Sequence, residues 1–315
     1  MLKNRAMVYV VSVMALSMLY STVYFFISLK EMSEICLLNV QTPAGEMCVI
    51  NFALVFMSIY MFMPLITAVV LQKLIYKEKL SDIGFRFKWS YWILAALFIP
   101  IAASYGSMLP ALFIPGVVFT PDMSGMIERF AGTMQPEQIE LMKEQTKDLG
   151  AAFFAVGILQ MIVAALTINA LFALGEEAGW RGFFLKNLEK YGFYKKSFIV
   201  GAVWGVWHFP IIIQGHNYPQ NPEIGVVMMI IFCIFYSPFF TYIVEKTGSV
   251  FYAAFMHGAI NASAGAGIMF LSGGNDLMVG ATGAAGFIVL LAGNAALALY
   301  DKYIAKEKVI FRSGV

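Results

Sequence analysis

Two adjacent glutamates, Glu176 and Glu177, stand near the end of a long apolar run that begins at Ala151. A charged side chain at the centre of a bilayer costs about 2.5–3.5 kcal/mol on insertion scales, so a carboxylate pair there indicates a functional site. If the helix continues, Glu177 and Arg181 are i,i+4 neighbours in the favourable order, with the acid on the N-terminal side. Glu176 points about 100° away from that pair and is left without this partner, which makes it a candidate for chemistry.

Two of the three histidines lie in other apolar runs and could meet these carboxylates. His208 lies within the run 197–214, and His257 lies within the run 250–271. Asn261 follows His257 by four residues, so both side chains project from the same face of a helix. His216 lies in a short polar segment, and we interpret it as a solvated loop residue.

Counting residues from the predicted membrane surface places the three groups at a similar depth. At 1.5 Å per residue, His208 lies roughly 16 Å, His257 roughly 10–13 Å and Glu176 roughly 15 Å below the inner surface. We therefore expect one shared cavity, open to the cytoplasm. The alternative is that buried polar groups only join helices, at about 0.6–2 kcal/mol each, but so many polar groups at one depth favour a site.

This set of side chains is suited to the hydrolysis of peptide bonds by water. A glutamate in an apolar pocket can act as a general base near neutral pH. A nearby histidine can position the attacking water, or bind a divalent metal such as Zn²⁺ that acidifies it. The second histidine and Asn261 would stabilise the oxyanion. The candidate metal ligands are Glu176, His208 and His257, and a metal-free Glu/His pair is the other option.

The same residues resemble the motifs of the CAAX protease and bacteriocin-processing family of intramembrane proteases, which includes the CAAX prenyl endopeptidases. The family pattern is Glu-Glu-x-x-x-Arg, then aromatic-x-x-x-His, then His-x-x-x-Asn or Asp. In this chain it occurs in that order, within 174–262, as Glu176-Glu177 with Arg181, Trp204 with His208, and His257 with Asn261. Trp204 stands where the family usually has Phe.

The resemblance implies roles for these residues. Glu176 would activate water with Glu177 assisting, and Arg181 would orient the glutamate pair. His208 would share the water or a metal, and His257 with Asn261 would form the oxyanion or metal side. The substrate would be a peptide or protein, either prenylated or not, in CAAX-type or bacteriocin processing.

Two other functions compete with an intramembrane glutamate-dependent, metallo-type endopeptidase. The first is a non-catalytic bacteriocin-immunity or scaffolding membrane protein that keeps the motif geometry for stability or partner binding. The second is a transporter with an intramembrane Glu/His proton path. The chain lacks the internal repeats that are common in transporters, which disfavours the second.

The composition sets the fold class that must position these groups. Of the 315 residues, 60% are hydrophobic and 13% are charged, whereas a soluble domain has about 25% charged residues. We therefore expect an all-α, polytopic membrane protein that forms one domain over residues 1–315 and contacts membrane lipids. About eight runs are long enough to span a bilayer: 7–28, 49–74, 91–114, the run from 151, 197–214, 224–244, 250–271 and 279–300.

The positions of Lys and Arg predict the orientation. With eight spans, the outside segments hold only Lys30, Arg129, Lys143 and Lys147, and the other 17 of the 21 Lys and Arg residues lie on the opposite side. Positively charged residues favour the cytoplasmic side of a membrane. We therefore expect both termini in the cytoplasm of a multi-pass cell-membrane protein, with the bacterial plasma membrane as its location. No long basic run is present, so we expect no nucleic-acid partner.

Two further features lie on the predicted outer side. The polar insert 120–150 has apolar residues at roughly helical spacing and predicts either one or two amphipathic helices on the outer face or a plain connector. Cys36 and Cys48 lie in one predicted outside loop, where an oxidising compartment would let them pair. Two free thiols are the alternative.

Overall fold

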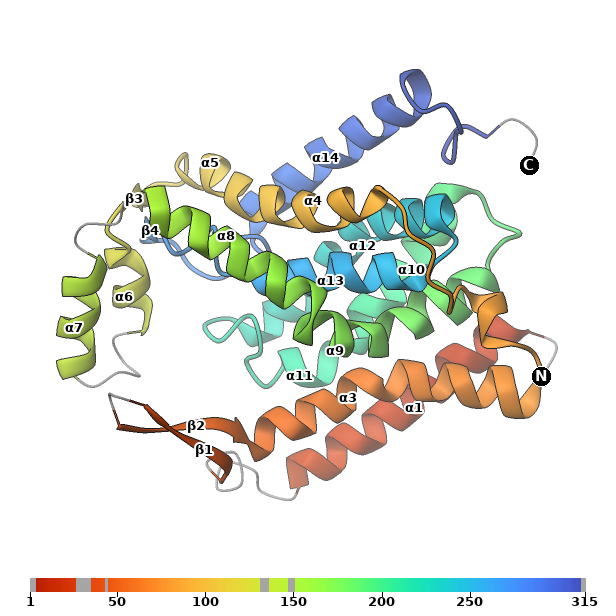
Figure 1. Cartoon of the computed structure of the whole chain (residues 1–315), viewed down its shortest axis with the longest axis horizontal. Coiled ribbons are helices and arrows are strands. Elements are labelled where there is room, and N and C mark those ends of the chain that lie inside the picture. Colours follow the sequence, from red (N-terminus) through yellow and green to blue (C-terminus); the bar gives the residue numbers. More distant parts are fainter. Residues whose placement is uncertain (1–3, 27–34, 43–44, 131–135, 147–150, 313–315) are drawn as a thin grey trace.

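The chain forms a mainly helical bundle (Figure 1). The computed structural model describes residues 4–26, 35–42, 45–130, 136–146 and 151–312. Strands in this part of the chain are confined to two short antiparallel pairs. The prediction of an all-α, polytopic membrane protein is confirmed.

Long apolar helices make up most of the bundle. Within the described ranges, five are long and apolar enough to cross a membrane: α1 (Arg5–Phe26), α3 (Phe52–Val69) with the π-helical η1 (Val70–Ile75), α4 (Trp92–Gly106) with α5 (Met108–Ala111), α12 (Pro222–Thr247) and α14 (Ala284–Tyr303). α3 begins where the side chain of Asn51 accepts a hydrogen bond from the backbone N–H of Leu54 at 2.8 Å. Such a cap satisfies an N–H group that has no partner within the helix.

A sixth crossing is broken into two helices. α8 (Ala151–Leu166) and α9 (Ile168–Glu177) meet at Thr167 with a bend of 45°, and the π-helical η4 (Ala178–Phe184) continues α9. The hydroxyl of Thr167 donates to the carbonyl of Val163 at 2.6 Å. This back-bonding of a Thr side chain to the preceding turn often bends a helix.

Two predicted spans are shorter than expected. α10 (Phe193–Trp207) has 15 residues and α13 (Val250–Ser263) has 14, whereas a crossing needs about 20. α10 ends at Trp207, and the four-residue α11 (Phe209–Ile212) follows. The run 250–271 is helical only to Ser263, because the glycine-containing segment after it forms turns. The count of about eight spans therefore stays a prediction.

α13 lies in the middle of the bundle and contacts α4, α8, α9 and α12 (Figure 1). Small residues let the backbones approach closely, as is common between membrane helices. A Cβ atom added at Gly258 would lie 2.6 Å from the carbonyl oxygen of Ala165 on α8. A Cβ atom added at Gly205 of α10 would lie 2.5 Å from the Cα of Ile230 on α12. These contacts pack α13 closely against α8, and α10 closely against α12.

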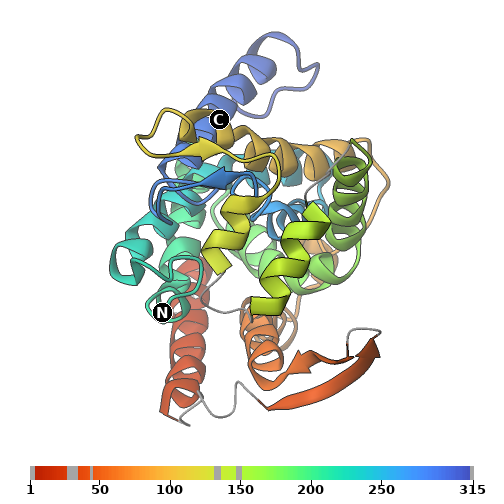
Figure 2. The ribbon, with the colours of Figure 1, turned by 90° about the vertical axis from the view of Figure 1, so that its left-hand side faces the viewer.

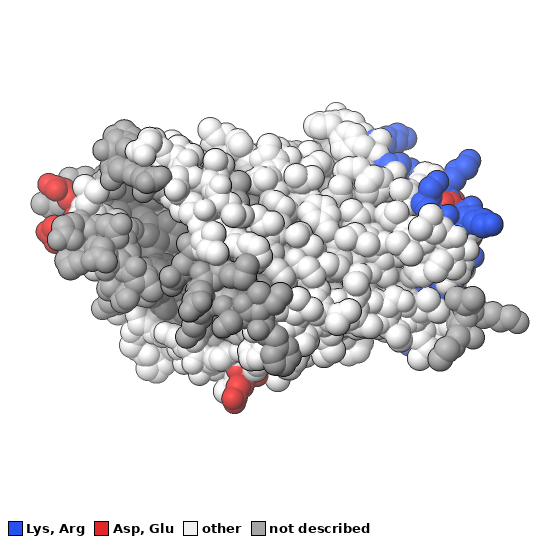
Figure 3. All heavy atoms as spheres, turned by 90° about the horizontal axis from the view of Figure 1, so that it is seen from below, with Lys and Arg blue, Asp and Glu red and all other residues white. Residues whose placement is uncertain are grey.

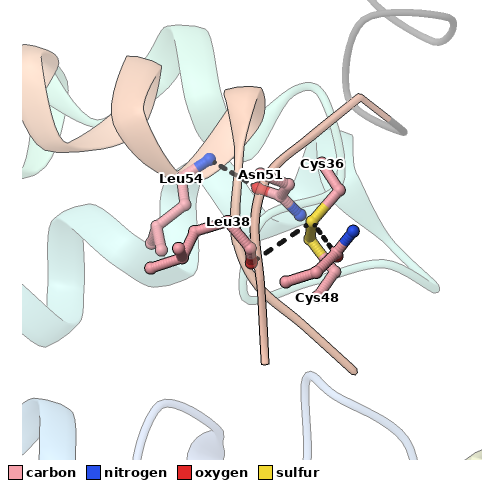
Figure 4. Close-up of a disulfide and its surroundings, with 6 residues drawn as sticks. Cys36, Leu38, Cys48, Asn51 and Leu54 are labelled. Atoms are coloured by element: carbon pink, nitrogen blue, oxygen red, sulfur yellow. Dashed lines mark hydrogen bonds between the residues drawn. A yellow bond between two sulfur atoms is a disulfide. The ribbon is translucent and has the colours of Figure 1, made fainter. Parts of the chain in front are cut away.

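A disulfide-bonded hairpin precedes α3. β1 (Cys36–Thr42) pairs antiparallel with β2 (Gly45–Asn51), and Cys36 is bonded to Cys48 (Figure 4). Of the two alternatives for these cysteines, the structure has the disulfide. It ties the hairpin together directly before the capped start of α3.

The polar insert contains two short helices, α6 (Ser124–Phe130) and α7 (Pro136–Thr146). They lie at the end of the molecule that Figure 2 views face-on. The adjoining strand β3 (Val118–Phe119) pairs with β4 (Leu271–Ser272). Before α6, Asp122 accepts a hydrogen bond from the backbone N–H of Ser124 at 3.1 Å, which lowers the pKa of the Asp122 carboxyl. The insert thus contains two helices, while their amphipathic character and their location on the outer face stay predictions. Segments 131–135 and 147–150 lie outside the described residues.

The two ends of the bundle differ in charge. Lys and Arg gather at one end, together with some acidic side chains, whereas Asp and Glu are the charged side chains seen toward the other end (Figure 3). α1 begins and α14 ends at the Lys/Arg-rich end, near the 3-10 helix η2 (Leu80–Ile83), whereas the disulfide hairpin and α7 lie toward the other end (Figure 1). We call these the basic end and the hairpin end. The cytoplasmic location of the basic end stays a prediction.

Candidate active site

The Glu177–Arg181 pair lies in the wall of the bundle with both side chains fully buried. Nη1 of Arg181 donates to Oε1 of Glu177 at 3.0 Å, as the i,i+4 spacing predicts. The pair spans the junction of α9 and η4. π-helical turns within α-helices are frequent at functional sites.

Two aromatic rings enclose the charge of Arg181. Its guanidinium carbon lies 4.3 Å from the ring centre of Trp204 and 4.1 Å from that of Phe240. Contact with an aromatic face stabilises a desolvated cation by about 2 kcal/mol. Nε and Nη2 of Arg181 have no hydrogen-bond partner among the described residues, so the rings are their main contacts.

Glu177 also holds one of the candidate histidines. Nδ1 of His257 lies 2.8 Å from Oε1 of Glu177, the oxygen that also accepts from Arg181. A carboxylate at this distance favours the tautomer with the proton on Nδ1 and leaves Nε2 free to act. Glu177 therefore positions His257.

Glu176 has a different partner. Nε1 of Trp204 donates to Oε2 of Glu176 at 2.7 Å, and the Glu176 side chain is buried. The two glutamates are adjacent in sequence but belong to separate hydrogen-bond networks. A donor of this kind holds a carboxylate in one orientation.

His208 is positioned by the end of its helix. α10 ends at Trp207, and Nδ1 of His208 lies 2.8 Å from the carbonyl oxygen of Trp204. A backbone carbonyl only accepts, so Nδ1 carries the proton and Nε2 is left as the acceptor. The half-buried ring packs edge-on against the Trp204 ring, with 5.5 Å between centroids.

A cavity of about 660 Å³ joins these groups. Four of the predicted site residues line it: Glu176, His208, His257 and Asn261. The other two, Glu177 and Arg181, lie behind this layer and contact it through His257 and Trp204. The predicted convergence of side chains from α9, α10 and α13 is thus what the structure has.

Sequence reasoning missed three residues of the site. Tyr60 of α3 lines the cavity and donates from its hydroxyl to the carbonyl of Trp207 at 2.8 Å. Phe240 covers Arg181, and Trp204 was noted only as a motif aromatic and not as the donor to Glu176. Phe240 and Tyr60 lie in uniformly apolar runs that offer no sequence signal for such a role.

The candidate metal ligands do not form a metal site in this arrangement. Among the described residues, no group of three or more His, Cys, Asp or Glu side chains is placed to hold a metal ion. Nδ1 of His257 contacts Glu177 and Oε2 of Glu176 accepts from Trp204, so these two side chains would offer a metal only Nε2 and Oε1. As the side chains are placed, Glu176, His208 and His257 are not grouped around a metal ion.

The lining of the cavity includes residues at one end of the bundle. Among them are Asn51, His216, Asn217 and Thr282. These residues lie in segments that connect helices at the hairpin end, away from the Lys/Arg-rich end (Figure 1). The described lining therefore reaches the hairpin end, and the expected opening toward the cytoplasm stays a prediction. Counting residues along a helix predicts how deep a side chain lies in the bundle. It does not predict at which end of the bundle a cavity at that depth opens.

The fold and this arrangement define a polytopic helical membrane protein with a polar site among its helices. Residues 154–263 match the family model described as Type II CAAX prenyl endopeptidase Rce1-like. Over 57 residues the chain is 39% identical to CAAX prenyl protease 2 of Methanococcus maripaludis. This aligned stretch is 18% of this chain and 21% of the length of that protein. The resemblance to the CAAX protease family is thereby confirmed, for the segment that contains all three motifs.

Proposed function

We infer that the protein is an intramembrane endopeptidase in which Glu176 activates a water molecule for attack on a peptide bond. The observation that carries this proposal is the shared cavity of Glu176, His208, His257 and Asn261, with Glu177 and Arg181 fixed behind it. The similarity of residues 154–263 to CAAX prenyl endopeptidases supports the same reaction class.

The proposed reaction uses the free atoms of these side chains. Glu176, oriented by Trp204, takes a proton from water while the water oxygen bonds to the carbonyl carbon of the substrate. Nε2 of His208 shares the water. His257, when both of its ring nitrogens carry a proton, donates from Nε2 to the carbonyl oxygen as it becomes negative, together with the amide N–H of Asn261. The C–N bond then breaks, and Glu176 returns the proton to the leaving nitrogen.

The substrate we propose is a peptide or protein segment that enters from the membrane environment. Apolar side chains of Met61, Met229, Phe232 and Ile260 line the cavity beside the polar groups. Such a wall suits an apolar side chain or a lipid-modified residue. Processing of a lipidated CAAX-type protein or of a bacteriocin-like peptide, in a bacterial plasma membrane, fits this proposal.

A peptide-cleavage assay on the purified protein in detergent tests the proposal. Glu176→Gln keeps the shape of the side chain and removes the base, so we expect a loss of about 100-fold or more in kcat. Glu189→Gln, at an exposed position far from the cavity, is the matched control and should cleave normally. Normal cleavage by Glu176→Gln and by His208→Ala would refute the proposed roles. An immunity phenotype that survives both substitutions would favour the non-catalytic alternative.

A further inference from the structure

The described lining of the site cavity reaches the surface at the hairpin end of the bundle. Its deep part is formed by the buried residues Glu176, Trp204 and His257. Its rim is formed by Asn51, His216, Asn217 and Thr282, of which His216 and Asn217 are exposed. A smaller cavity that shares Met57, Ile211 and His216 with it continues outward along α11.

Toward the basic end the cavity is closed by η4. All seven residues of Ala178–Phe184 are buried. The ring of Tyr9 packs against Trp180 and Phe183 with centroid distances of 5.6 and 5.3 Å. A separate cavity at the basic end, lined by Ser81, Arg86 and Arg181 among others, shares no described residue with the lining of the site. A substrate that approaches from the basic end would meet this packed layer first.

The rim is continuous with the disulfide hairpin. Asn51 is the last residue of β2, pairs with Cys36 across the hairpin and caps α3 (Figure 4). The rim on the opposite side is also fixed, because the hydroxyl of Tyr218 donates to the carbonyl of Thr282 at 2.8 Å. The hairpin that holds the disulfide therefore borders the mouth of the cavity.

Two independent criteria place this mouth outside the cytoplasm. Lys and Arg gather at the opposite end (Figure 3), and positively charged residues mark the cytoplasmic side of a membrane protein. Disulfides form and persist in oxidising compartments outside the cytosol. The charge distribution and the Cys36–Cys48 bond agree, although neither depends on the other.

We propose that the site receives its substrate from the extracytoplasmic side, as an exported peptide or an outward-facing segment of a membrane protein. This rests on the proposed peptidase function and, of the substrates proposed for it, favours the exported, bacteriocin-like peptide over the CAAX-type protein. The side chains at the rim are uncharged amides, a hydroxyl and an imidazole, and apolar residues follow deeper in the cavity. An extended peptide with an apolar side chain at the cleaved bond matches this order.

Cysteine labelling in intact cells tests the side of the opening. His216→Cys places a thiol on the rim, and Ser81→Cys places one in the cavity at the basic end. The native cysteines give no background, because Cys36 and Cys48 are bonded and Cys233 is buried. We expect a membrane-impermeant maleimide to label His216→Cys in intact cells and Ser81→Cys only after permeabilisation. The reverse pattern would overturn the proposal, and Thr282→Cys provides a second rim position if the first variant does not fold.

The same labelling in a Glu176→Gln background separates this inference from the proposed function. Labelling reports the position of the rim and does not require cleavage, so the pattern should be unchanged.

A second arm uses sealed vesicles whose protein orientation is known from the labelling. A membrane-impermeant fluorogenic peptide added outside should be cut only by protein with the hairpin end outward. Cleavage only by the opposite orientation would refute the proposed access side while leaving the peptidase function intact.

Discussion

Nε1 of Trp204 donates a hydrogen bond to Oε2 of Glu176 at 2.7 Å, while the face of the same indole covers Arg181 at 4.3 Å. One side chain thus contacts both the candidate base and the cation of the neighbouring network. Trp204 also packs edge-on against His257, with 5.4 Å between ring centroids. The indole therefore contacts the candidate base, the buried cation and one of the site histidines.

We predict that Trp204→Phe lowers kcat and changes KM little. The substitution keeps an aromatic ring over Arg181 but removes the N–H group that orients Glu176. A hydrogen bond to a charged group is worth about 1.5–3 kcal/mol, so a loss of roughly tenfold or more is expected in peptide-cleavage assays. The fold should tolerate the change, because phenylalanine is the usual residue of the resembled family at this position. Trp92→Phe is the control, since its ring packs against Tyr242 with 5.6 Å between centroids and lies outside the cavity lining. Equal losses in both variants would argue against a specific role.

Arg181→Met should destabilise the protein strongly. It leaves the fully buried Glu177 without its cation, and breaking a buried ion pair in this way costs about 3–5 kcal/mol. Thermal unfolding in detergent is the measurement, with Lys186→Met as the control. Lys186 pairs with Glu189 at an exposed site, where a pair is worth about 0–1 kcal/mol. A melting temperature of Arg181→Met close to that of the wild-type protein would contradict the assigned packing.

Gly179→Ala should be destabilising because η4 has no room for a methyl group at this position. The added Cβ would lie 2.2 Å from the hydroxyl of Tyr9 and 2.7 Å from the carbonyl oxygen of Pro64. Overpacking of this kind costs about 1–3 kcal/mol. Gly157→Ala in α8 has open space around the new atom and should be neutral or stabilising by up to about 1 kcal/mol. Both unfolding temperatures can be measured in the same detergent, and a loss confined to Gly157→Ala would show that η4 packs differently.

Removal of divalent metal should leave cleavage unchanged. The described residues do not place three ligands around one point. Activity before and after dialysis against a chelator, together with the metal content of the purified protein, provides the measurement. Loss of cleavage on chelation that Zn²⁺ restores would instead establish a metal bound by a rearranged set of these side chains.

The depth of the site residues along their helices could be predicted from the sequence. Four-residue spacing predicts the Glu177–Arg181 contact, and counting along helices brings Glu176 level with His208 and His257, as the shared cavity has them. These inferences succeed because the rise and the turn of a helix are nearly constant.

Other features depended on contacts between distant segments and could not be read from spacing. Helical counting assumes regular helices, whereas Thr167 bends one crossing and Ala178–Phe184 is π-helical. The end at which the cavity opens depends on how η4 packs against Tyr9, a residue more than a hundred positions away. The run 250–271 is apolar throughout, but its later glycines favour turns over helix, so α13 ends early.

The absence of a side chain at Gly258 has a consequence for the imidazole beside it. α13 rests on the bend between α8 and α9 so closely that main-chain atoms touch, and the amide of Asn169 donates to the carbonyl of Gly258 at 3.3 Å. The position of His257 along the bundle relative to Glu177 is therefore set by contacts of the main chain, rather than by apolar side chains that can be substituted. Apolar residues elsewhere in these helices can therefore change in size during evolution while Glu177 and His257 keep their alignment.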